Sequence, residues 1–137
     1  MSEDVRALLT GTRTWAVVGC SPDPGRDSYR IAALLQREGF RVIPVNPAGG
    51  EEILGERVYP SVAAIPAAEG VEVVDVFRRS ELAGAHVDEA IVAGAAGVWL
   101  QLGVIDEAAA ARAREAGLRV VMDRCPAIEL PRLRRAG

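Results

Sequence analysis

Short apolar runs that alternate with segments of helical period constrain the fold of this chain more than any other feature. These runs have the length of buried strands and lie at residues 14–19, 41–45, 72–77, 98–100 and 118–122. Helical patterns separate or follow them at about 27–38, 61–65, 80–93, 106–116 and 128–133. Repeated strand–helix alternation implies right-handed crossovers, which make the strands parallel and cover both faces of the sheet with helices. The sequence therefore predicts a single α/β domain over residues 1–137, a Rossmann-like doubly wound sheet of about five parallel strands.

Capping residues and tryptophans refine this prediction. Asp27 or Ser28 is expected to cap the first of these helices, and Asp106 the alanine-rich helix. Trp15 and Trp99 lie inside predicted strands, so we expect them in the core rather than as platforms that stack on a base.

The basic residues are all arginine. The chain has 16 of them, no lysine, and 19 acidic residues, for a formal net charge of -3. Schiff-base chemistry, a lysine general base and a Walker-type phosphate loop all need a lysine amine, so the composition excludes them. The net acidity also argues against general nucleic-acid binding, which depends on a basic face.

Cysteine usage and hydropathy bear on the compartment. Cys20 and Cys125 are too few and too far apart in sequence for a disulfide framework or a zinc site, so we expect reduced thiols and no metal. The N-terminal residues are acidic and polar, and no apolar run approaches the roughly 18 residues of a membrane span. We therefore expect a cytoplasmic protein without membrane contact.

Arginines gather in the loops that leave the predicted strands. Ligands of open α/β sheets bind at the carboxyl ends of the strands, near the point where the strand order reverses. Arg26, Arg78, Arg79 and Arg124 fall in these loops. Guanidinium groups pair bidentately with phosphate and carboxylate, so the loops favour an anionic ligand. The alternative is that Arg78 and Arg79 pair with neighbouring carboxylates and serve the structure only.

The first loop suits a phosphate but lacks the dinucleotide fingerprint. It precedes a helix whose N-terminus offers free N–H groups. After Gly19, the next glycines of G-x-G-x-x-G are replaced by Ser21 and Pro24, and Asn46 stands where NAD-binding domains carry an acidic residue. These departures disfavour an NAD-dependent dehydrogenase and leave other nucleotides open.

Five segments in order between residues 16 and 129 resemble the stand-alone CoA-binding domain proteins: AVVGCSPDPGRDSYRIAALLQREGFRVIPVNP, LGERVYPSV, VDVFRR, VWLQLG and AGLRVVMDRCPAIE. That family is itself similar to the CoA-binding domain of the succinyl-CoA synthetase alpha subunit. The resemblance implies a module that binds coenzyme A or an acyl-CoA.

Carried over by position, the resemblance implies ligand contacts at the strand ends. They are Gly19, Cys20 and Ser21 in the first turn, Arg26, Ser28 and Tyr29 near the phosphates, Asn46 and Pro47 against the adenosine, Phe77 and Arg78 after the third strand, and Gln101, Leu102 and Gly103 beside the pantetheine. Synthetase-type domains carry a lysine just after the second-strand proline, where this chain has Ala48 and Gly49. Any phosphate charge must therefore be met by arginine.

No catalytic constellation is evident in the sequence. The single histidine, His86, falls in mid-helix, where a structural role is expected. Asp75 alternates within a strand and Asp123 is expected to cap the last segment, so neither is assigned to catalysis. Cys20 beside a helix N-terminus is either a small buried residue or, with Cys125, a redox or thioester contact for the CoA thiol.

The leading hypothesis is a non-catalytic CoA-binding module that takes a small nucleotide ligand. The alternatives are a subunit of an acyl-CoA ligase type enzyme that needs a separate catalytic subunit, and an NAD-type nucleotide-binding redox sensor. The sequence is compatible with a protein partner, with a homo-oligomer and with neither. The phosphohistidine domain of the synthetase has no counterpart in the 137 residues.

Overall fold

The computed structural model describes residues 1–136 and contains the predicted parallel sheet. Its five strands are β1 (Thr14–Val18), β2 (Arg41–Val45), β5 (Val73–Val76), β6 (Gly97–Leu100) and β7 (Arg119–Met122). The strand order is β2-β1-β5-β6-β7, and all four pairings are parallel. The sheet confirms the Rossmann-like α/β class expected from the alternating pattern.

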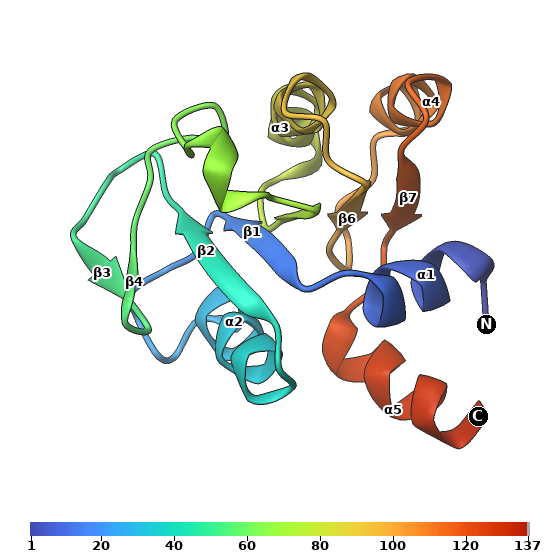
Figure 1. Cartoon of the computed structure of the whole chain (residues 1–137), viewed down its shortest axis with the longest axis horizontal. Helices are drawn as coiled ribbons and strands as arrows, with labels where there is room; N and C mark the ends of the chain where they lie inside the picture. The colour runs from blue at the N-terminus through green and yellow to red at the C-terminus, as the bar shows by residue number, and fades with distance from the viewer. Residues whose placement is uncertain (137) are drawn as a thin grey trace.

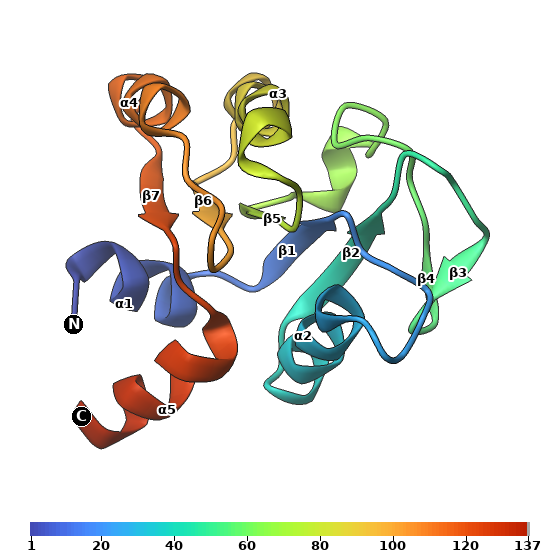
Figure 2. The same ribbon diagram turned by 180° about the vertical axis from the view of Figure 1, so that it is seen from behind.

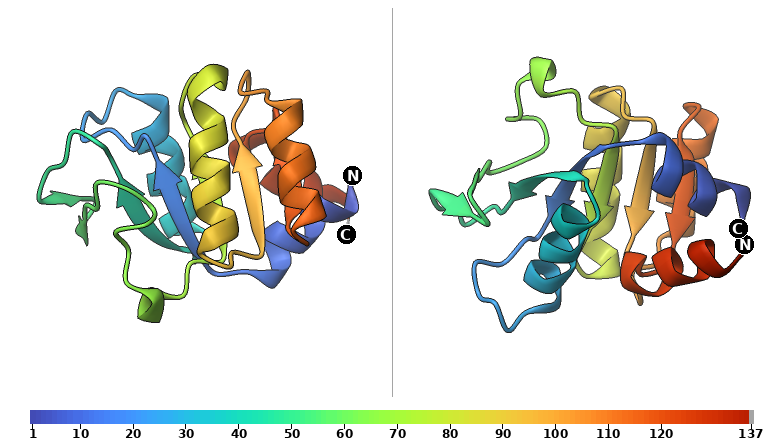
Figure 3. Two further views of the ribbon diagram at one scale, coloured as in Figure 1. Left: turned by 90° about the horizontal axis from the view of Figure 1, so that it is seen from above. Right: turned by 60° about the horizontal axis from the view of Figure 1, so that its bottom comes forward.

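Helices cover both faces of the sheet (Figures 1 and 2). One face carries α1 (Glu3–Gly11), α2 (Asp27–Arg37) and α5 (Pro126–Ala136), and the opposite face carries α3 (Ser80–Val92) and α4 (Glu107–Glu115). Seen from above, α3 and α4 lie side by side along the strands (Figure 3). None of the helices described within residues 1–136 has the length and apolar character needed to cross a membrane.

Two hydrophobic clusters, one on each face, hold the layers together. Trp15 and Trp99 are fully buried on the face of α1, α2 and α5, with ring centroids 5.4 Å apart, and Phe40 packs against Trp15 at 5.3 Å. Their expected place in the core is confirmed. On the other face, valines from the sheet meet alanines from α3 and α4, whose small side chains let these helices lie close to the strands.

Several regions differ from the prediction, beginning with the N-terminal segment and residues 61–65. The N-terminal segment forms α1, with the Ser2 hydroxyl accepting the Val5 N–H as an N-cap. Its Val5, Leu8 and Leu9 are buried at helical spacing, a short apolar stripe that the acidic, polar flanks obscure. The expected helix at 61–65 is wrong: Ser61 Oγ accepts the Ala64 N–H in a local turn instead.

The connection between β2 and β5 is irregular in the structure. It contains a two-stranded antiparallel ribbon of β3 (Glu52–Ile53) and β4 (Glu56–Arg57), followed by the short 3-10 helix η1 (Ala67–Glu69). None of these elements was expected, because two-residue strands carry no periodicity that a sequence pattern can reveal.

The start of α2 also differs from the prediction. Arg26 occupies the N-cap position and makes no side-chain cap bond, so neither Asp27 nor Ser28 caps the helix. The Ser28 hydroxyl instead accepts the Ser21 N–H at 2.9 Å. Asp106 does cap α4 as expected, with its Oδ1 3.0 Å from the Ala109 nitrogen.

Candidate functional site

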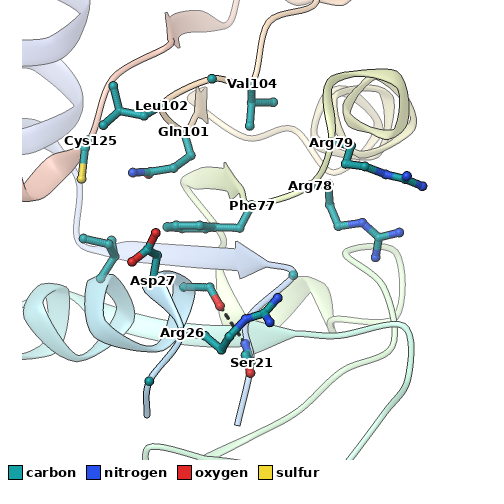
Figure 4. A pocket seen from close by; sticks show the side chains of 15 residues that line it. Ser21, Arg26, Asp27, Phe77, Arg78, Arg79, Gln101, Leu102, Val104 and Cys125 are labelled. Carbon is teal, nitrogen blue, oxygen red and sulfur yellow. Dashed lines mark hydrogen bonds between the residues drawn. The ribbon is translucent and has the colours of Figure 1, made fainter. Parts of the chain in front are cut away.

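A cleft of ≈ 780 Å³ opens at the carboxyl end of the sheet, where the strand order reverses around β1. Strand β2 lies on one side of β1 and β5 on the other, so the loops that follow β1 and β5 diverge and leave a crevice between them. Nine of the thirteen predicted contact residues line it, as shown in part in Figure 4: Gly19, Ser21, Arg26, Ser28, Phe77, Arg78, Gln101, Leu102 and Gly103.

Four of the predicted contact residues lie outside the lining: Cys20, Tyr29, Asn46 and Pro47. Asn46 connects the loop after β2 to the loop after β1. Its Nδ2 donates to the Cys20 carbonyl at 3.0 Å, and its Oδ1 accepts the Ala48 N–H at 2.9 Å. Tyr29 packs against the core and Pro47 is exposed. Their ligand contacts stay predictions.

Six further residues line the cleft that the residue-by-residue resemblance did not assign: Gly25, Asp27, Ile31, Arg79, Val104 and Cys125. Ile31 and Val104 look like ordinary core positions in the sequence, because an apolar residue carries no sign of which cavity it borders. Arg79 and Cys125 fall in loops at the ligand edge, and that position was their only sequence signal.

The wall of the cleft at the end of β1 depends on Gly19. This residue has φ +82, and a Cβ atom there would lie 2.3 Å from the Phe77 carbonyl oxygen. The Gly19 and Cys20 N–H groups both donate to the Val45 carbonyl, at 2.8 and 3.2 Å. The glycine thus lets the ends of β1, β2 and β5 converge, so the packing of the strand ends by itself requires a glycine at this position.

The loop from β1 to α2 is ordered by its own hydrogen bonds. Asp23 Oδ1 accepts the Gly25 N–H at 2.9 Å, and Ser21 Oγ accepts the Asp23 N–H at 3.0 Å. The N-terminus of α2, which follows this loop, lies at the cleft, and Arg26, Asp27 and Ser28 form part of the wall. A helix N-terminus without a side-chain cap offers N–H groups and a positive dipole end to an anion.

The arginines at the cleft differ in their partners. Arg79 lies 3.6 Å from Glu81, which agrees with the alternative of a structural pair. Within residues 1–136, Arg26 and Arg78 form no ion pair. Arg78 does not pair with Asp75 either, because both carboxylate oxygens of Asp75 are buried without a hydrogen-bond partner among residues 1–136. Two guanidinium groups are therefore free to meet an anionic ligand.

Cys20 and Asp75 lie in the interior rather than in the cleft wall. Both side chains are fully buried. Burial, and secondarily the Asp75 carboxyl, raises the pKa of the Cys20 thiol to about 11. Burial alone raises the pKa of Asp75 well above its ordinary value. The Cys20 thiol is therefore protonated at neutral pH, and the expectation of a reactive Cys20 gains no support.

The opposite wall of the cleft, called the far wall here, is formed by the loops after β6 and β7, which are hydrogen-bonded to each other. Asp123 Oδ1 accepts the Gly103 N–H at 2.7 Å, so the expected role of Asp123 in capping the last helix is wrong. Asp123 adopts φ 59, which turns its carboxylate across to the neighbouring loop. The Trp99 Nε1 donates to the Arg124 carbonyl at 2.9 Å and anchors the same loop to the core.

His86 lies on α3, outside the lining of the cleft. It is half-buried, and its Nδ1 lies 3.2 Å from the Glu89 Oε1. The expected structural role is consistent with this contact.

A parallel sheet with a cleft at its switch point, an uncapped helix N-terminus and two free arginines defines a Rossmann-like domain suited to an anionic ligand. Residues 13–131 match the model of a family described as CoA binding domain, and the chain belongs to this family. The resemblance drawn from the sequence segments is thereby confirmed.

Three proteins illustrate the similarity. The Bacillus subtilis (strain 168) protein named "Uncharacterized protein YneT" is 34% identical over 122 residues, covering 89% of this chain and 88% of the relative. A hypothetical protein from Pyrococcus horikoshii OT3 has a TM-score of 0.88 and 43% identity, covering 96% of this chain and 90% of that one. The dinucleotide-forming acetyl-coenzyme A synthetase 1 of Ca. Korarchaeum cryptofilum, in complex with phosphate and ADP, has a TM-score of 0.71 and 26% identity, covering 89% of this chain and 28% of its own.

Proposed function

We propose that this chain binds coenzyme A or an acyl-CoA and acts as a non-catalytic binding module. The observation that carries the proposal is the pair of free arginines, Arg26 and Arg78, beside the N-terminus of α2. Charge-assisted hydrogen bonds from guanidinium and backbone N–H groups are the usual means of holding phosphates. Membership of the CoA-binding domain family supports the same ligand.

The apolar part of the cleft suits the rest of the ligand. Phe77 and Val104 contribute apolar surface to the cleft (Figure 4), and Ile31 also lines it. Coenzyme A combines a phosphate-bearing nucleotide with a long uncharged pantetheine arm that ends in a thiol. A cleft that carries arginines at one end and apolar side chains beside them complements both parts.

The non-catalytic role is supported by the surroundings of the reactive side chains. His86 lies outside the cleft, and the thiol of Cys20 has its pKa raised to about 11 by burial and Asp75. Within residues 1–136, no group of three or more His, Cys, Asp or Glu side chains is placed to hold a metal ion. Acid–base or nucleophilic catalysis needs a positioned group of matched pKa, which binding alone does not.

Isothermal titration with CoA, acetyl-CoA, ADP and NAD tests the proposal. We expect the CoA compounds to bind more tightly than ADP, because the pantetheine arm adds apolar contacts. NAD should bind weakest, since Asn46 offers no carboxylate to the ribose and both ends of its amide are engaged by Cys20 and Ala48. Tighter binding of NAD than of CoA would favour the redox-sensor alternative instead.

Removing either free arginine should weaken CoA binding. We expect Arg26→Ala and Arg78→Ala each to cost about 1 to 3 kcal/mol, roughly a 5- to 150-fold rise in Kd, through loss of charged hydrogen bonds to phosphate. Titration with CoA and with pantetheine, which lacks phosphates, measures the effect, and the loss should be confined to CoA.

Arg37→Ala is the matched control for these variants. Arg37 is exposed in the last turn of α2, at the end of the helix opposite the cleft. This variant should keep the parent Kd for CoA. If Arg26→Ala and Arg78→Ala also keep it, those two arginines serve the structure rather than the ligand.

A second candidate is a subunit of an acyl-CoA ligase type enzyme. It is favoured by the synthetase of Ca. Korarchaeum cryptofilum, in which the similar region makes up 28% of a longer chain. Recovery of a stoichiometric partner that gives acyl-CoA ligase activity only when mixed with this chain would establish that role. Full CoA affinity without such a partner supports the binding module.

A further inference from the structure

The cleft has chemically distinct ends. Arg26, Arg78 and Arg79 lie toward one side, whereas Cys125 lies on the opposite side beyond the ring of Phe77 (Figure 4). A ligand whose phosphates meet the arginines and whose uncharged arm crosses Phe77 would bring its far end to Cys125. In coenzyme A, the far end of that arm is a thiol.

Cys125 is positioned at the start of a helix. It directly precedes Pro126, the first residue of the 11-residue helix α5, and its carbonyl accepts the Ile128 and Glu129 N–H groups, each at 2.9 Å. The side chain is only 6% exposed, and the sulfur faces the cleft (Figure 4). The thiolate is the form of cysteine that attacks in disulfide exchange.

Gln101 is independent evidence for a ligand at this end. Its side chain is 8% exposed, lines the same cleft and extends toward the side of Cys125 (Figure 4). Its buried Oε1 has no hydrogen-bond partner within residues 1–136. Because an unsatisfied buried acceptor is costly, the group indicates a missing donor. The amide N–H groups of a pantetheine arm are donors of the required kind.

We propose that Cys125 forms a mixed disulfide with the terminal thiol of the bound CoA moiety, a step that rests on the proposed function. The oxidant is the ligand in its disulfide form. The Cys125 thiolate attacks one sulfur of CoA disulfide, a new sulfur–sulfur bond forms, and the ligand disulfide breaks. The bond's electron pair goes to the departing CoA thiolate, which takes up a proton from water. Excess small-molecule thiol reverses the exchange.

The second cysteine provides a matched control. Cys20 is fully buried, does not line the cleft, and has a thiol pKa raised to about 11 by burial and Asp75. The thiolate is therefore scarce at neutral pH, and CoA disulfide has no path to it in the folded protein. Among the described residues, Cys125 is therefore the one thiol that CoA disulfide can reach.

Intact-mass spectrometry of the full chain after incubation with CoA disulfide tests the proposal. We expect one CoA adduct per chain, located on Cys125 by peptide mapping and removed by dithiothreitol. Cys20→Ser should retain the adduct, and Cys125→Ser should lose it. Glutathione disulfide lacks the nucleotide, and its reaction should be slower by a factor of about ten or more. The reason is that binding of CoA disulfide in the cleft raises the effective concentration of the reacting sulfur.

The outcomes separate this proposal from CoA binding itself. If Cys125→Ser and Cys125→Ala, checked for native near-ultraviolet circular dichroism, bind CoA in titration while the parent forms no adduct, the disulfide is overturned and the binding function stands. An adduct on Cys20, or equal rates with glutathione disulfide, also overturns it. Absence of CoA binding by the parent overturns the proposed function and this inference together.

Discussion

Replacing Gly19 with alanine is expected to lower the free energy of unfolding by about 3 kcal/mol or more. Two costs combine at this position. The residue has φ +82, where an L side chain is strained, and the new Cβ would lie 2.3 Å from the Phe77 carbonyl oxygen. That oxygen belongs to the backbone at the end of β5, so it cannot rotate away as a side chain would. Relief requires the ends of β1 and β5 to separate.

A second glycine separates the cost of backbone strain from the cost of the contact with Phe77. Gly39 also has a positive φ, +96, but a Cβ there would meet nothing within 4 Å. Gly39→Ala should therefore show only the backbone strain, about 1 to 2 kcal/mol. Urea unfolding followed by the fluorescence of the buried Trp15 and Trp99 measures both variants. Equal losses would show that the contact with Phe77 contributes nothing.

Replacing Asp75 with asparagine should flatten the dependence of stability on pH. The carboxyl is fully buried and has no hydrogen-bond partner in the described part of the chain, and burial raises its pKa well above the ordinary value. Between the pKa of the unfolded chain and that of the folded chain, only the folded state holds this proton. The protonated Asp75 carboxyl thus contributes its full stabilisation below about pH 3.9, the pKa of the unfolded chain. This stabilisation falls by about 1.4 kcal/mol per pH unit above that value and is lost once the pH has risen through the folded pKa.

The comparison of the two proteins across pH gives the test. As the pH rises from 5 toward the raised pKa of the folded carboxyl, the parent should lose stability relative to Asp75→Asn, which has no proton to release at this site. Urea unfolding at each pH measures the difference. Glu115→Gln, which neutralises an exposed carboxylate on α4, should run parallel to the parent. Parallel curves for Asp75→Asn as well would contradict a buried, protonated Asp75.

Much of the fold could be predicted from local pattern. The runs at 14–19, 41–45 and 98–100 correspond to strands because continuous apolar stretches suit a parallel sheet that is covered on both faces. The α1 helix was missed because its three buried residues are embedded in polar sequence. The turn at 61–65 was misread because Pro60 and Pro66 leave too short a stretch for a helix, whatever its apolar content.

The candidate site could be predicted only in part. The strand ends identify the loops, so most of the predicted contacts do line the cleft. Asn46 follows β2 and Tyr29 lies in the first turn of α2, yet their side chains turn to the Cys20 carbonyl and to the core. A loop position does not determine the direction of its side chain, because that direction depends on backbone torsions and on partners elsewhere in the chain.

By itself, the sequence determined the α/β class, the carboxyl edge as the ligand side and the dependence on arginine for any phosphate contact. These properties follow from periodicity and composition, which are local. Only the tertiary structure decided that Cys125 rather than Cys20 faces the cleft and that, within residues 1–136, Arg78 has no ion pair and Asp75 is buried without a partner. Burial, pairing and access depend on contacts between segments far apart in sequence, such as Gly19 with Phe77, and no local pattern encodes them.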